Sequence, residues 1–331
     1  MILAQEPALR SALWLHRSAT RPQPILGPHM RCPNPAVPNA RAIIPEEASM
    51  SPEAHSLAMV AAHRARHPLV LIKPRWTILL AFYNEAGCIE ATLRQLLTQT
   101  RTFRLVLVDN GSTDASVACC EAALADAQVD YVILTEAQVQ GQTAAFERGL
   151  SQVDTEFVAT CDADTFYPYD YLQQAERLFD RDERVVVASA YFLEQDWHLY
   201  RAFASALHQL GAFHLLPRQG HVGAAGHAFR TARLKAAGGY SYRLWPFLMG
   251  DHEIIHRVLQ HGRQSMSMQH WCCPSPRRGA PLRWSLLERI LYHLTPFPLK
   301  GRYFRWLAVR FERSGMWASR LRTRDWIEAG Q

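Results

Sequence analysis

The chain has 331 residues and a hydrophobic fraction of 48%, so it can bury a sizeable core as two domains or as one large α/β domain with extensions. Its seven irregularly spaced cysteines exclude the disulfide framework of a small secreted domain and favour a reducing cytoplasm. No stretch reaches the roughly 18 consecutive apolar residues of a membrane helix. Glu6, Pro7 and Arg10 interrupt the segment in which a signal peptide would have its apolar core.

The first 70 residues differ in composition from the rest of the chain. Eight prolines lie between Pro22 and Pro52 and no apolar periodicity is sustained, so we predict a flexible extension over residues 1–70. Met50 stands before Ser51-Pro52-Glu53, which suits a helix start, so the native protein could also begin at Met50.

From Trp76 onward, short apolar runs rich in β-branched residues alternate with segments of helical periodicity. The expected strands are 77–82, 105–108, 131–134, 157–160 and 185–188, and the expected helices between them are 86–97, one from 112–114 to 125, and 141–150. Ser112, Thr113 and Asp114 are all residue types that cap helix N-termini, and capping is the role we prefer for them. Strands that alternate with helices predict an α/β fold with a mostly parallel sheet.

Two carboxylates, Asp162 and Asp164, directly follow the expected strand 157–160. Residues two apart on an extended segment point to the same side, so both side chains emerge together at the carboxyl end of this strand. Ligands of open α/β sheets bind at that end. Clustered carboxylate oxygens suit Mg²⁺ or Mn²⁺, which keep coordination positions open for the phosphates of a substrate. The pair therefore predicts a metal site.

Four motifs follow the expected elements in one order, and together they are far more specific than any one of them. They are Phe82-Tyr83-Asn84-Glu85, Val108-Asp109-Asn110-Gly111-Ser112-Thr113-Asp114, Asp162-Ala163-Asp164 and Gly250-Asp251-His252-Glu253. Through them, roughly residues 75 to 275 resemble family 2 glycosyltransferases. The resemblance implies the GT-A fold, a Rossmann-like, mixed and mostly parallel sheet flanked by helices. We expect this domain over residues 71–275, followed by a basic, Trp-containing helical segment over 276–331.

The resemblance also implies where a nucleotide would bind. The turn Tyr83-Asn84-Glu85 would hold the base, with Tyr83 against its face. Because this turn precedes a helix, we expect free N–H groups and the positive end of the helix dipole there. Asp109 would contact the base or the ribose. Tyr83 as ordinary cover of the core is the alternative.

The remaining nucleotide-sugar contacts follow from the same resemblance. Asp162 would hold the ribose and Asp164 the metal ion on the diphosphate, with Asp162 as a further metal ligand. Gly141 and Gln142 would border the nucleotide. The segments 226–230 and 238–240 would shape the pocket for the donor sugar and the acceptor.

The chain departs from the family pattern at three positions. Asn110 stands where the family often has a second Asp, Gln142 where it commonly has a basic residue, and Gly250 where it has the first of two acids. These departures leave open a protein of the same fold that binds a nucleotide or glycan without chemistry. The intact Asp162, Asp164 and Asp251 argue against that alternative.

Asp251 is the candidate general base. Lying beneath the apolar run 245–249, its carboxylate is expected to have a raised pKa and to deprotonate an acceptor hydroxyl. An N-cap role is the structural alternative.

A competing interpretation lies in the same helix. His252-Glu253-Ile254-Ile255-His256 matches the His-Glu-x-x-His pattern of zinc peptidases, in which the two histidines bind zinc and the glutamate activates water. No third ligand follows at a known spacing, and the zinc interpretation leaves the strand-end motifs unexplained.

The end of the chain is strongly basic. Residues 274–331 contain twelve Lys or Arg and four acids, a charge of +8 against +6 for the whole chain, so the remainder is slightly acidic. Basic helices with tryptophan suit an anionic membrane surface, although a solvated face packed on the core has the same composition. Nucleic acid is not expected. Processive members of the family carry a Gln-x-x-Arg-Trp motif, of which this chain keeps only Arg283-Trp284. We therefore predict transfer of one sugar rather than polymer synthesis.

Taken together, these features predict a glycosyltransferase of hexosyltransferase type that depends on Mg²⁺ or Mn²⁺. It would move a single sugar, with inversion, from a UDP- or GDP-type sugar nucleotide to a hydroxyl acceptor. Lipid-linked and cell-envelope glycans are the acceptors we expect. The predicted location is the cytoplasm, at the inner face of the membrane.

Overall fold

The structure is a computed structural model that describes residues 73–193, 199–220, 222–275 and 285–319. All of these residues lie in the second of the two units into which the chain divides, residues 32–331. The predictions for residues 1–70 and for Arg283-Trp284 lie outside the described residues. The domain boundaries at residues 70 and 275 stay predictions.

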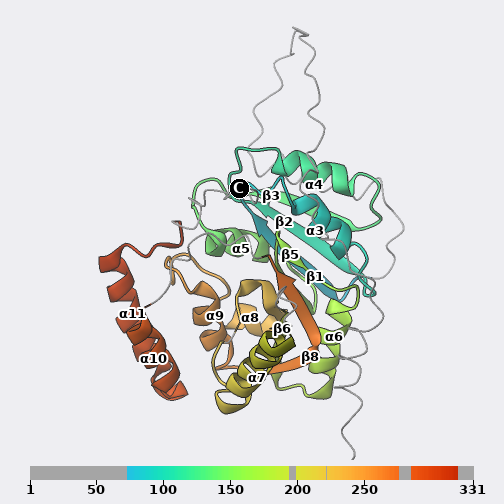
Figure 1. Ribbon diagram of the computed structural model, residues 1–331. Helices are drawn as coiled ribbons and strands as arrows, with labels where there is room; N and C mark the ends of the chain where they lie inside the picture. The colour runs from blue at the N-terminus through green and yellow to red at the C-terminus, as the bar shows by residue number, and fades with distance from the viewer. Residues whose placement is uncertain (1–72, 194–198, 221, 276–284, 320–331) are drawn as a thin grey trace, which may run out of the picture. The chain divides into compact units, whose positions relative to one another are not determined.

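The described residues form a mixed, mostly parallel sheet of eight strands in the order β3-β2-β1-β4-β7-β6-β8-β5 (Figure 1). The strands are β1 (Trp76–Phe82), β2 (Phe103–Asp109), β3 (Asp130–Thr135), β4 (Phe157–Asp162), β5 (Thr165–Phe166), β6 (Val185–Phe192), β7 (His227–Arg230) and β8 (Arg263–Pro274). The first four in this order are parallel, and β7 runs antiparallel to both of its neighbours. The five expected strands and the expected fold class are confirmed.

Helices cover both faces of the sheet. They are α3 (Ile89–Leu96), α4 (Ser116–Leu124), α5 (Gln142–Leu150), α6 (Tyr171–Arg181), α7 (Leu199–Leu215), α8 (Thr231–Ala236), α9 (Gly250–Val258), α10 (Leu286–Leu294) and α11 (Lys300–Ser314). No helix in these described ranges is both long and apolar enough to span a bilayer.

The core has two layers because side chains alternate along each buried strand. In β1, Ile78 and Leu80 pack with α3, α4 and α6, whereas Leu79 and Ala81 pack on the other face with α5, α8 and α9. Continuous apolar runs, rather than alternating ones, therefore predicted these strands correctly.

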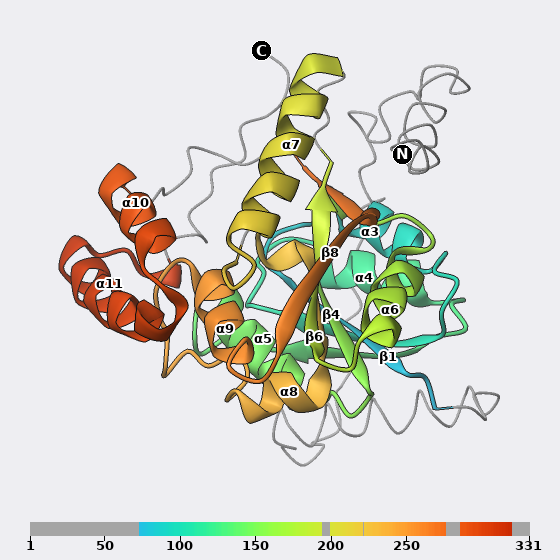
Figure 2. The same cartoon turned by 90° about the horizontal axis from the view of Figure 1, so that it is seen from below.

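Helices α10 and α11 lie beside α9 (Figure 2), and a third apolar cluster joins them to the loop before α9. Trp245, Phe247 and Leu248 of the loop pack on Tyr292 of α10 and Phe304 of α11. After α11 the chain returns to the same loop, where the N–H of Leu248 donates to the carbonyl of Met316 at 3.1 Å and that of Ala318 to Pro246 at 3.0 Å. The C-terminal helices thereby hold the segment that leads into α9.

Two predicted helix starts are wrong. The helix expected from Ala86 begins at Ile89, and the helix expected from residues 112–114 begins at Ser116 with Ala115 at its N-cap. Asp114 still bonds to the helix start, because its Oδ1 accepts from the N–H of Ser116 at 2.9 Å, whereas the side chains of Ser112 and Thr113 bond to the turn after β1.

Gly149 tests the close contact between α5 and the sheet. A Cβ there would overlap Leu79 Cδ1 and lie 2.8 Å from Val108 Cγ2. We expect Gly149→Ala to lower the free energy of unfolding by about 1–3 kcal/mol in urea titrations, because overpacking outweighs the better helix propensity of alanine. Gly211→Ala in α7 is the matched control, since its Cβ meets nothing within 4 Å. Equal stability of the two variants would contradict the expected contact.

Candidate active site

The carboxyl ends of β1, β2 and β4 meet at one edge of the sheet. The parallel register pairs Phe82 with Asp109 and Ala81 with Asp162. The turn that starts at Tyr83, the turn after Asp109 and the Asp162–Asp164 pair therefore lie side by side. The structure brings these predicted site residues together, although they are up to 81 positions apart in the sequence.

The turn after β1 and the turn after β2 are bonded to each other. Asn84 adopts a left-handed conformation, with φ of 53°, which asparagine tolerates. The N–H groups of the first turn donate to side chains of the second: Asn84 to Ser112 Oγ (3.0 Å), Glu85 to Ser116 Oγ (2.7 Å) and Ala86 to Asp114 Oδ2 (3.1 Å). The expectation that these N–H groups are free for a ligand is therefore wrong.

Asp109 and Asn110 are buried at the end of β2. Asp109 is only 6% exposed, and its Oδ1 accepts a hydrogen bond from the N–H of Ser112 at 2.8 Å. The amide of Asn110 donates to the carbonyls of Glu136 (2.7 Å) and Val139 (2.9 Å) and accepts from the N–H of Gly141 (2.7 Å). Asn110 thus joins β2 to the start of α5, and an aspartate would lack the two donors.

The two carboxylates stand where β4 ends. Asp162 is the last residue of β4 and Asp164 lies in the turn that leads to β5; both are half-buried, whereas Ala163 between them is buried. Gln142 Nε2, in the first turn of α5, donates to Asp162 Oδ1 at 2.8 Å. The hydroxyl of Tyr167 accepts from the N–H of Asp162 at 2.9 Å. Asp162 is therefore held from both its side chain and its backbone.

The donor set of this pair fits Mg²⁺ or Mn²⁺. Two carboxylates offer hard oxygen ligands, and no group of three or more His, Cys, Asp or Glu side chains that could hold a metal ion occurs among the described residues. Such a pair suits an ion that takes its other ligands from water and from substrate phosphates.

Asp251 lies in the first turn of α9 but does not cap it. The N-cap is Met249, which has a left-handed φ of 64°. Asp251 Oδ1 accepts from the N–H of His252 at 2.8 Å and lies 2.9 Å from His252 Nδ1. Burial alone would raise the pKa of Asp251, but the charge and hydrogen bonds of His252, together with nearby His227, hold it below the ordinary value. The expected raised pKa is therefore wrong, because the sequence pattern did not reveal these partners.

The first turns of α5 and α9 are in close contact. A Cβ on Gly250 would lie 2.9 Å from Thr143 Oγ1, which accounts for glycine at the position where an acid was expected. Gln142, next to Thr143, bonds to Asp162, so the first turn of α5 contacts both the start of α9, where Asp251 lies, and the carboxylate pair.

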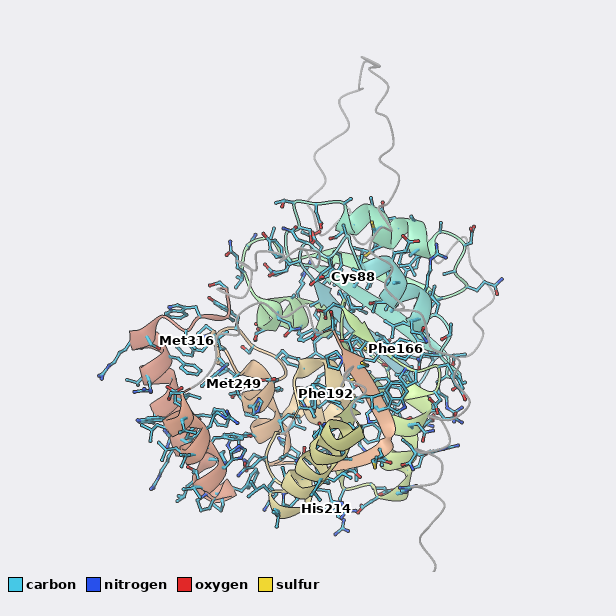
Figure 3. The ribbon with its side chains drawn as sticks, viewed as in Figure 1. Cys88, Phe166, Phe192, His214, Met249 and Met316 are labelled. Carbon is cyan, nitrogen blue, oxygen red and sulfur yellow. The ribbon has the colours of Figure 1, made fainter. Side chains whose placement is uncertain are left out.

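Phe192 adjoins this site and was missed in the sequence. A Cβ on Gly223 would lie 3.7 Å from Asp251 Oδ2 and 3.8 Å from the ring of Phe192, the residue labelled in Figure 3. The side chain of Gln209 in α7 accepts from the N–H of Phe192 at 2.9 Å and donates to its carbonyl at 2.8 Å. The apolar run had predicted β6 only to Ala188, four residues short, so nothing marked Phe192.

The geometry does not favour a zinc peptidase. Glu253, which would activate water, is paired with Arg257 at 2.7 Å and 2.9 Å. His256 stacks on Phe304, and burial lowers its pKa to about 4. Within the described residues there is also no third ligand for a metal ion held by the two histidines.

Comparisons with known proteins show which family and which fold this chain resembles. Residues 77–234 match the family model described as glycosyl transferase family 2. The glycosyltransferase GlyA of Streptococcus pneumoniae serotype 4 is 29% identical over 106 residues, which are 31% of this chain and only 15% of GlyA. The mannosyltransferase PcManGT from Pyrobaculum calidifontis, solved in complex with GDP-Man and Mn²⁺, has a TM-score of 0.50 at 19% identity, covering 82% of this chain and 83% of its own. The structural likeness shows that the fold is GT-A.

Asn110 provides a test of the link between β2 and α5. In Asn110→Asp, a carboxylate would face the carbonyl oxygens of Glu136 and Val139, so we expect a loss of about 1–3 kcal/mol in the free energy of unfolding. Urea denaturation measures it. Gln128→Glu, the same change at an exposed position, should cost about 0.5 kcal/mol or less. A similar cost for both variants would show that the amide has no structural role.

His252 provides a test of the lowered pKa of Asp251. Because this pKa is below that of the unfolded chain, ionised Asp251 stabilises the fold above the ordinary Asp pKa, and the contribution is lost as pH falls through the folded-state value. In His252→Ala, burial remains without its partner, so the pKa should rise. NMR titration of the Asp251 carboxyl carbon measures it, with exposed His261→Ala as control. An unchanged pKa in His252→Ala would refute the assigned cause.

Proposed function

Because residues 77–234 form a family 2 glycosyltransferase domain, we propose that this protein transfers one sugar from a nucleoside diphosphate-sugar to a hydroxyl acceptor. The observation that carries the proposal is the contact of the first turn of α5 with both parts of the site. Gln142 bonds to Asp162, and the neighbouring Thr143 packs on Gly250, next to Asp251. PcManGT, which binds GDP-Man and Mn²⁺, supports a sugar nucleotide as the donor, of either GDP or UDP type.

In this proposal Asp251 is the general base. Its lowered pKa keeps the carboxylate charged at neutral pH, ready to take the proton of an acceptor hydroxyl. The acceptor oxygen then attacks the anomeric carbon from the side opposite the leaving group, and the bond from that carbon to the diphosphate breaks with inversion. The proton stays on Asp251 and the electron pair leaves with the nucleoside diphosphate.

The remaining residues position the donor. Asp162 and Asp164 would hold Mg²⁺ or Mn²⁺, which when bound neutralises the charge that develops on the departing diphosphate. Asp162 is oriented by Gln142, so it is suited to contact the ribose as well. Tyr83 and Asp109 would contact the nucleoside, although Asp109 is only 6% exposed.

The acceptor and the location are part of the proposal. Lipid-linked or cell-envelope glycans suit a protein whose basic C-terminal segment can approach an anionic membrane. The cysteine pattern of the sequence supports a cytoplasmic location, at the inner face of the membrane.

Substitution of the two key carboxylates tests the proposal. Release of nucleoside diphosphate from UDP- and GDP-sugars is measured with Mn²⁺, using alkyl glycosides as hydroxyl acceptors. Asp251→Asn should lower the transfer rate by a factor of about 10²–10⁴, the usual contribution of a general base. In Asp164→Ala, added Mn²⁺ should no longer raise the transfer rate. Exposed Asp126→Asn should behave as wild type. Transfer at the wild-type rate in both site variants, or binding of sugar nucleotides without any turnover, would overturn it.

A further inference from the structure

Helix α10 exposes a stripe of large apolar side chains, which we call the α10 stripe. Its members are Leu286 (71% exposed), Leu287 (53%), Ile290 (44%) and Leu294 (74%). Three of them are four residues apart, so they lie on one side of the helix. Contiguous exposed apolar patches are uncommon on soluble proteins and mark surfaces that bind a partner.

The opposite side of α10 already packs on the protein. Tyr292 is buried, and Glu288 accepts from the hydroxyl of Tyr303 through its carbonyl at 3.0 Å and pairs with Arg310 through its carboxylate. Ser285 forms a capping box with Glu288 that fixes the helix start. The helix is therefore held without the α10 stripe, which contributes nothing visible to the core.

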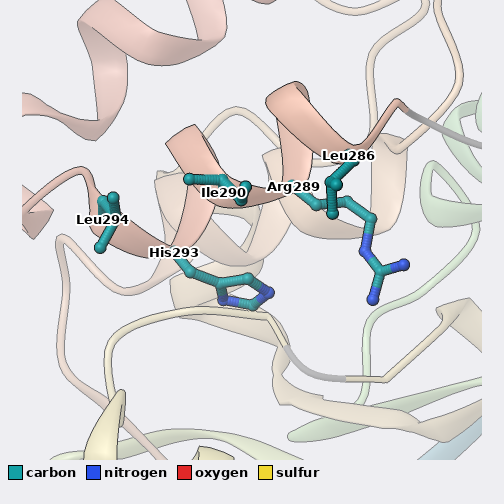
Figure 4. A pocket seen from close by; sticks show the side chains of 5 residues that line it. All are labelled: Leu286, Arg289, Ile290, His293 and Leu294. Carbon is teal, nitrogen blue, oxygen red and sulfur yellow. The ribbon is translucent and has the colours of Figure 1, made fainter.

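Basic side chains lie beside the α10 stripe and on the neighbouring helix α11. Leu286, Ile290 and Leu294 line a groove of about 300 Å³ together with Arg289 and His293 (Figure 4). Further exposed arginines and two exposed apolar side chains occur on α11, namely Arg302, Arg305, Arg313, Trp306 and Val309. An exposed apolar stripe on a helix with basic residues beside it and on the next helix has the composition of segments that lie in a membrane interface.

The charge of the chain favours lipid over the other occupants. Residues 276–284 contain three arginines and no acid, and residues 320–331 contain three arginines and two acids, so both have the same sign as the surface. A second copy docked through the α10 stripe would bring two basic surfaces together. Leucine and isoleucine offer no ring for stacking on nucleic-acid bases.

We propose that the α10 stripe docks on an anionic membrane surface. The apolar side chains of α10 enter the boundary between headgroups and acyl chains, and the arginines of α10 and α11 contact lipid phosphates. Docking does not depend on sugar transfer. It brings the C-terminal helices to the membrane, and with them residues 246–248, which bond to the segment after α11.

Vesicle flotation of the full chain tests the docking. The chain should float with vesicles of phosphatidylcholine and phosphatidylglycerol, much less with phosphatidylcholine alone, and less in high salt. The double variant Ile290→Asp, Leu294→Asp should reduce the bound fraction about tenfold, because it places charge in the boundary layer. Arg289→Gln should weaken binding to the anionic vesicles only.

Two controls separate docking from folding and from the proposed function. Leu244→Asp changes another apolar residue, 57% exposed and outside α10, and should float as wild type. Stabilisation of each variant by Mn²⁺ with GDP or UDP in thermal denaturation reports on the nucleotide site alone. Flotation of the double variant at the wild-type level, or a concentration-dependent dimer that it abolishes, would overturn the proposal.

Discussion

The first turn of α5 is the contact on which the site depends. The N–H of Gly141 donates to Asn110, and the side chain of Gln142 donates to Asp162. Thr143 packs so closely on Gly250 that a side chain there would clash with it. Three consecutive residues thus connect the end of β2, the end of β4 and the start of α9. Gly141 has a φ of 120°, which glycine adopts without strain, and it lies against Ala318, which follows α11. A displacement of this turn would separate the carboxylate pair from Asp251.

The same contact explains why the chain departs from the family pattern where it does. Asn110 supplies the donors that an aspartate lacks, and Gly250 allows α9 to approach Thr143. These positions are adapted to one another by packing, so they are poor evidence for lost chemistry. The charge of the base is set locally as well, because His252 compensates the burial of Asp251.

Much of the fold was predictable because buried parallel strands appear as continuous apolar runs that end at polar residues. The ends of β1, β2 and β4 and their meeting at one edge followed from that pattern. The bonds of the turn after β1 did not, because they involve side chains 28–31 positions away. The direction of the pKa shift of Asp251 depends on how His252 is oriented. The exposure of the α10 stripe depends on which side of that helix packs on the protein. Sequence periodicity gives neither.

The central claim is that one edge of the sheet holds both the nucleotide and its metal ion, within reach of Asp251. Anomalous diffraction from crystals grown with Mn²⁺ and GDP or UDP tests it most directly. We expect an anomalous peak bonded to a carboxylate oxygen of Asp164 and to the diphosphate. A peak between His252 and His256, or a nucleotide bound away from Asp162, would contradict it.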